Sequence, residues 1–122
     1  MAWDLKSDRP IYSQLIEQIQ LKIVSGLYPA GSKLPSVRDM ASDASVNPNT
    51  MQRALAELEN EGLLYSQRTS GRFITEDVSK MTELKEQIAR EQIQLFLKNM
   101  EQLGLSREDI RRLLEKEWKE ES

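Results

Sequence analysis

Polar side chains that can recognise nucleic-acid bases lie close together near the middle of the chain, at Asn49, Gln52 and Arg53. Asn and Gln pair with adenine and Arg pairs with guanine, each good pair contributing about 1–3 kcal/mol of discrimination against the wrong base. Thr50, which lies between them, suits a phosphate together with the free N–H groups of a helix start. These residues predict contact with double-stranded DNA, provided that a helix presents them.

Helices that position these residues are predicted in the first half of the chain. Apolar residues at three- and four-residue spacing predict an amphipathic helix from about Pro10 to Ser25. Ser36, with Asp39 three residues later, resembles a capping box and predicts the start of a short helix that ends at Ala44. Ser45 begins the turn that follows.

Asn47 and Pro48 predict the start of a third helix, which continues to about Glu61. Asn accepts a hydrogen bond from an N–H group of the first turn, and Pro at the first helical position sacrifices no helical hydrogen bond. The apolar stripe of this helix consists of Met51, Ala54, Leu55 and Leu58. Asn49, Gln52 and Arg53 lie off that stripe and are expected to face the major groove.

Two short strands are predicted at 63–67 and 72–75, joined by a turn that contains Gly71. The order helix, helix, turn, helix, hairpin is that of a winged helix-turn-helix, so we expect a mainly α fold with a small β-hairpin. Arg68, Thr69 and Arg72 are then expected to follow the DNA backbone or minor groove. The alternative for Arg68 and Arg72 is that they only keep the hairpin tip soluble.

The charge distribution supports a DNA-facing surface, although the chain as a whole is acidic, with a net charge of −3 and a pI of about 5.1. Residues 76–122 carry the whole deficit, whereas residues 1–75 carry eight basic and eight acidic side chains. No Asp or Glu occurs within residues 44–56 or 62–75, the two segments that a winged helix presents to a duplex. For Arg53, an ion pair with Glu57 is the alternative to DNA contact.

Composition argues against an enzyme. The sequence contains no Cys and no His, and it has no nucleophile–base signature, phosphate loop or spaced metal cluster. We therefore expect no catalytic residues, no cofactor and no metal. We also expect no membrane segment and no export leader, and hence a cytoplasmic protein. The remaining rival to a DNA-binding protein is an interaction adaptor that uses a winged helix without touching nucleic acid.

The last part of the chain changes character, and we expect a domain boundary after residue 75. Residues 76–122 are predicted to form a helical hairpin, with one helix from about Asp77 to Gln102 and another that begins at Ser106. Two isolated helices bury too little apolar surface to be stable, so their apolar faces must pack on each other, on the first domain or on a second copy. We favour the second copy because paired half-sites increase affinity. The expected homodimer contacts are Phe96, Leu97, Leu113, Leu114 and Trp118.

Several segments resemble the GntR family of bacterial transcriptional regulators over roughly residues 10–75. They are Tyr28-Pro29-Ala30-Gly31-Ser32-Lys33-Leu34-Pro35-Ser36-Val37-Arg38, Val46-Asn47-Pro48-Asn49-Thr50, Ala54-Leu55, Leu58-Glu59-Asn60-Glu61-Gly62-Leu63 and Gly71-Arg72-Phe73-Ile74. The sequence departs from the family pattern at Ser45, where a turn glycine is frequent, and at Pro48, where arginine is frequent.

This resemblance implies a further DNA contact, at Arg38. The Asn47-Pro48-Asn49-Thr50 version is similar to the YtrA-like branch, whose members carry a short helical tail in place of a large ligand-binding domain. The resemblance therefore implies a sequence-specific regulator, most often a repressor, that binds a pseudo-palindromic operator as a homodimer. It names no small-molecule effector.

Overall fold

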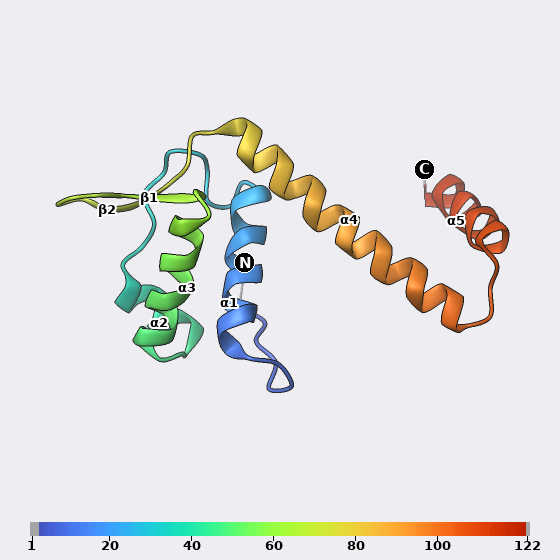
Figure 1. Ribbon diagram of the computed structural model, residues 1–122, viewed down its shortest axis with the longest axis horizontal. Coiled ribbons are helices and arrows are strands. Elements are labelled where there is room, and N and C mark those ends of the chain that lie inside the picture. The colour runs from blue at the N-terminus through green and yellow to red at the C-terminus, as the bar shows by residue number, and fades with distance from the viewer. Residues whose placement is uncertain (1–2, 122) are drawn as a thin grey trace. The chain divides into compact units, whose positions relative to one another are not determined.

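The computed structural model describes residues 3–121, and its helices and strands follow the predicted order (Figure 1). They are α1 (Ile11–Val24), α2 (Val37–Ala44), α3 (Pro48–Asn60), β1 (Leu64–Gln67), β2 (Gly71–Ile74), α4 (Val78–Gln102) and α5 (Arg107–Glu121). The hairpin β1–β2 extends away from the group formed by α1, α2 and α3 (Figure 1). The predicted fold class, mainly α with a small antiparallel hairpin, is confirmed.

The core lies where α1 and α2 pack on α3. Leu15, Ile19 and Ile23 of α1 have no exposed surface, and they belong to the same buried cluster as Leu55 and Leu58 of α3. Burying each such side chain contributes about 1.5–3 kcal/mol. This apolar cluster holds one face of α3 against α1 and α2, and the opposite face of α3 remains exposed for other contacts.

The turn between α2 and α3 is fixed by local hydrogen bonds. The Asp39 N–H donates to Ser36 Oγ at 3.1 Å, so Ser36 caps α2 as predicted. Ser45 follows α2 with φ 57° and ψ 47°, the left-handed conformation that most side chains avoid. The Val46 N–H then donates to the Ala41 carbonyl at 2.9 Å, which closes the helix end.

The segment that precedes α1 is held by two glutamine side chains of that helix. The fully buried Gln14 amide accepts from the Lys6 N–H and donates to the Lys6 carbonyl, both at 2.7 Å, and it donates to the Arg9 carbonyl at 2.9 Å. Gln18 makes an equivalent pair of bonds with the backbone of Asp4. These bonds satisfy backbone groups that would otherwise lack partners.

Trp3 connects this segment to α2 and covers a buried lysine of α1. Its Nε1 donates to Asp43 Oδ2 at 2.9 Å, and the Lys22 Nζ lies 3.2 Å from the centroid of its ring. Burial lowers the pKa of Lys22, because desolvation disfavours the ammonium form, while the charge of Asp43 acts in the opposite direction. Trp3 and Tyr28 are both partly buried and pack against the core cluster.

The first compact unit runs to Lys85 and so includes the beginning of α4. Met81 and Leu84 pack against the core cluster, and the Lys80 Nζ donates to the Glu61 carbonyl at 3.0 Å. The first unit therefore extends beyond residue 75, the position at which the change in amino-acid composition led us to expect a boundary.

The second unit begins at Glu86 and contains the rest of α4 together with α5. Ser106 and Asp109 form a reciprocal capping box at the start of α5, each backbone N–H donating to the other side chain at 3.1 Å. These bonds to Ser106 lower the pKa of Asp109. Ile110 is buried, whereas most other apolar side chains of this unit are exposed. Within residues 3–121, no helix combines the length and the apolar character needed to cross a membrane.

Candidate nucleic-acid interface

The start of α3 presents the base-recognising residues to solvent. The Asn47 side chain accepts from the Asn49 N–H at 2.7 Å, and Pro48 occupies the first turn, so the predicted cap is present. Because Met51, Ala54 and Leu55 face the core, the helix turns Asn49, Gln52 and Arg53 outward, and all three are exposed. Thr50 is half-buried beside them.

Arg53 is held against an aromatic ring of α1. The carbon at the centre of its guanidinium lies 4.7 Å from the ring centroid of Tyr12, a cation–π arrangement. Among the described residues, Arg53 forms no ion pair with Glu57. The guanidinium edge therefore keeps its donors available, and Tyr12 limits the directions in which they can point.

The wing, defined here as residues 64–74, consists of β1, β2 and the turn that joins them. Its antiparallel register pairs Leu64 with Ile74 and Ser66 with Arg72. The tip carries Arg68 and Thr69, both exposed, and Gly71 adopts a φ of 108° that a residue with a side chain would resist. Of the two predicted cations, Arg68 therefore extends into solvent, whereas Arg72 lies at the start of β2 and is half-buried.

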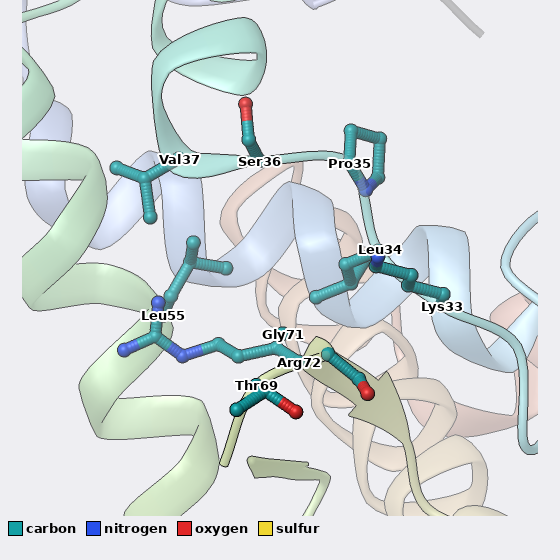
Figure 2. Close-up of a pocket in the computed structure, with 10 residues that line it drawn as sticks. Lys33, Leu34, Pro35, Ser36, Val37, Leu55, Thr69, Gly71 and Arg72 are labelled. Atoms are coloured by element: carbon teal, nitrogen blue, oxygen red, sulfur yellow. The ribbon is translucent and has the colours of Figure 1, made fainter. Parts of the chain in front are cut away.

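The loop before α2 is attached to the wing. The Leu34 N–H donates to the Arg72 carbonyl and the Ile74 N–H donates to the Ser32 carbonyl, both at 2.9 Å. Between this loop, α2 and the wing lies an open hollow of about 550 Å³ (Figure 2). Its lining includes Lys33, Ser36, Thr69 and Arg72, whose side chains are cationic or hydroxylic.

Arg72 reaches from β2 to α3 and joins the wing to the recognition helix. Its Nε donates to Glu59 Oε1 at 3.3 Å, and its NH1 donates to the Gln52 side-chain oxygen at 3.1 Å. Ser66, the cross-strand partner of Arg72, donates from Oγ to the same Glu59 oxygen at 2.6 Å. The hydrogen bond from Ser66 and the interaction with Arg72 together lower the pKa of Glu59, while partial desolvation opposes them.

The structure thus unites some of the predicted site residues and leaves others separate. Gln52 and Arg72 are joined by a hydrogen bond, whereas Arg38 lies exposed on α2 and Asn49 is exposed at the start of α3. Sequence reasoning did not single out Glu59 as a partner of these residues. A signal existed: Glu59 follows Gln52 by two helical turns and so shares its face.

The predicted dimer contacts belong to the second unit. Phe96 and Leu97 are half-buried there, whereas Leu113, Leu114 and Trp118 have relative exposures of 42%, 46% and 72%. A shallow hollow on α5 is lined by Leu114 and Trp118 together with the acidic residues Glu117 and Glu121.

Comparison with known proteins identifies relatives of this arrangement. Residues 11–74 match the model of a family described as bacterial regulatory proteins, gntR family. The HTH-type transcriptional regulator YhcF of Bacillus subtilis is 42% identical over 105 residues, which cover 86% of this chain and 87% of that protein. The HTH-type transcriptional repressor YtrA of the same organism is 41% identical over 91 residues, 70% of each chain.

Solved structures show the same similarity. A GntR family transcriptional regulator from Listeria monocytogenes matches with a TM-score of 0.84 and 39% identity, over 92% of this chain and 98% of that one. AraR(DBD) in complex with operator ORE1 matches with a TM-score of 0.53 and 28% identity, over 62% of this chain and 94% of that one.

Proposed function

Because this chain belongs to the gntR family of bacterial regulatory proteins and is a DNA-binding transcriptional regulator rather than an enzyme, we propose that it represses transcription as a homodimer on a pseudo-palindromic operator. The operator is double-stranded DNA, which the start of α3 and the wing contact. We also propose a cytoplasmic location, where a bacterial regulator meets its DNA.

The observation that carries the proposed interface is the absence of acidic residues from two adjoining surfaces. Residues 44–56 and 62–75 contain no Asp or Glu, and they supply the first part of α3, which carries the base-recognising residues, and the whole wing. Phosphate neutralisation by Lys and Arg supplies most of the sequence-independent affinity for DNA. Local positive charge therefore allows a protein with a net charge of −3 to approach a duplex.

We assign roles within this interface by position and chemistry. Asn49 and Gln52 face the bases of the major groove, with Arg53 beside them, and Thr50 contacts a phosphate near the start of α3. Arg38 contacts DNA from α2. The wing follows the backbone or the minor groove through Arg68 and Thr69, with Arg72 at its base.

Pairing of two copies is proposed for the tail, with DNA binding assigned to residues 1–75 and dimerisation to residues 76–122. The support is the apolar surface that the second unit leaves uncovered, which includes Leu103 at 71% relative exposure as well as Leu113 and Leu114. Exposed apolar surface of this kind marks an interaction site. Two-fold pairing also places two recognition helices on successive major grooves.

Footprinting across the region upstream of the protein's own gene tests the interface. We expect two protected half-sites, and we expect Arg38→Ala and Gln52→Ala each to weaken protection. Arg90→Ala is the matched control, because Arg90 is an exposed arginine of α4 outside the proposed interface. Unchanged protection with both interface variants would refute the contact assignment.

Light scattering tests the dimer separately. The unmodified protein is expected to have twice the mass of one chain at micromolar concentration. Leu114→Glu, which places a charge on the exposed apolar face, is expected to give monomers that bind operator DNA more weakly. A monomeric unmodified protein would contradict the proposed pairing.

A further inference from the structure

We propose that Arg72 is a positioning residue, which fixes the Gln52 amide so that its nitrogen faces the major groove and reads the N7 atom of a purine. This inference rests on the proposed interface, because it assumes that Gln52 meets a base. It assigns to Arg72 a role that acts through Gln52.

The chemistry of the two side chains fixes the orientation of the amide. Arg carries only hydrogen-bond donors, whereas the Gln amide has an oxygen that accepts and a nitrogen that donates. The group that lies 3.1 Å from the Arg72 NH1 must therefore be the oxygen of Gln52. Rotating the amide by half a turn would place two donors against each other. The amide nitrogen donates no hydrogen bond within residues 3–121, and it is directed away from Arg72.

Arg72 is itself held in place on its other side. Its Nε donates to Glu59 Oε1, whose position is fixed by the 2.6 Å hydrogen bond from Ser66. The Arg72 side chain is only 19% exposed, so most of its surface is already covered by the protein. Figure 2 shows it extending from the wing across to α3, beside Leu55. An arginine enclosed in this way can orient its neighbour before DNA arrives.

The orientation of the amide selects among the bases. In the major groove adenine and guanine both offer N7 as an acceptor and thymine offers O4, whereas cytosine offers only a donor. The Gln52 nitrogen can donate to N7 of either purine, whereas the oxygen is engaged by Arg72 and directed away from the base. An amide free to rotate would accept from cytosine as readily as it donates to a purine. Arg72 therefore excludes cytosine at this base pair.

Selection of binding sites from a library of randomised duplexes tests this role. Gln52→Ala identifies the base pair that Gln52 reads, because the preference at that position disappears. We expect the unmodified protein to prefer a purine over cytosine there by roughly five- to 100-fold. Arg72→Ala and Glu59→Ala are expected to lose most of that preference at the same position and to keep the others.

Arg68→Ala is the matched control within the wing. Since Arg68 is exposed at the tip, its removal is expected to weaken all sequences equally. If Arg72→Ala also weakens all sequences equally, or if it leaves the preference intact, the positioning role is overturned. If the unmodified protein selects no sequence at all, the proposed operator recognition fails instead.

A second measurement leaves the protein unchanged and so does not depend on the folding of any variant. A duplex that carries a 7-deazapurine at the position read by Gln52 lacks only the N7 acceptor. We expect the unmodified protein to bind this duplex at least about fivefold more weakly than the ordinary one. Equal binding of the two duplexes would show that the Gln52 nitrogen does not read N7 and would overturn the inference.

Discussion

Replacing Ser45 by glycine should stabilise the protein, because Ser45 occupies a backbone conformation that suits glycine. Its φ of 57° and ψ of 47° are left-handed, and within residues 3–121 no other residue except glycine has a positive φ. This conformation costs a residue with a side chain about 1–2 kcal/mol. Ser45 is exposed, and its contribution to the turn comes from its backbone N–H, which glycine keeps.

The net gain is smaller than the relieved strain. Glycine makes the unfolded chain more flexible, which offsets about 0.4–1 kcal/mol. The expected stabilisation is therefore about 0.5–1 kcal/mol, equivalent to a rise in Tm of about 2–5 °C. Because the change lies in the turn before Asn47 and removes none of the proposed DNA contacts, operator affinity should stay the same.

Thermal and urea unfolding, followed by circular dichroism, measure this effect. Ser42→Gly is the matched control, because Ser42 is also an exposed serine but lies within α2. Glycine inside a helix is unfavourable, so this control should lose about 0.5 kcal/mol. If Ser45→Gly destabilises the protein as much as Ser42→Gly does, the reasoning from backbone strain is refuted.

Three further changes have outcomes that the structure specifies. Gln14→Ala leaves the backbone groups of Lys6 and Arg9 without their partners, so urea unfolding should show a loss of about 2–3 kcal/mol, clearly more than for the less buried Gln18. Because the folded-state pKa of Glu59 lies below its ordinary value of 4.5, its stabilisation is complete above that value and is lost as the pH falls through the lower one. The stability difference between the unmodified protein and Glu59→Gln should therefore shrink as the pH falls below 4.5, and a difference that is constant with pH would contradict this assignment. Arg68→Ala should reduce the slope of log Kd against log salt by about one, whereas an unchanged slope would remove Arg68 from the phosphate contacts.

The parts of the fold that depend on local chemistry were predictable from the sequence. Asn47 and Pro48 define the start of α3 because capping needs only neighbouring residues, and the structure contains the expected bond between Asn47 and the Asn49 N–H. The hairpin was equally local, since Gly71 supplies the positive φ that its turn requires. Three of the four strand boundaries moved by one residue, within the usual range for strand ends, whereas the end of β1 at Gln67 was predicted correctly.

Contacts between distant segments were not predictable in the same way. The network of Glu59, Arg72 and Gln52 joins α3 to the wing, and no spacing along the chain specifies that pairing. The segment before α1 has no apolar periodicity that could predict its position. It is held instead by hydrogen bonds between its backbone and the side chains of Gln14 and Gln18. Polar contacts of this kind emerge only when the tertiary structure is known.

The most direct test of the central claim is the affinity of the purified protein for duplex DNA as a function of salt concentration. If the acid-free first part of α3 and the wing meet phosphate, log Kd should rise linearly with log salt, with a slope of about 0.9 for each phosphate neutralised. Arg38→Ala should lower both affinity and slope. No binding in dilute buffer, or binding that is independent of salt, would contradict the account.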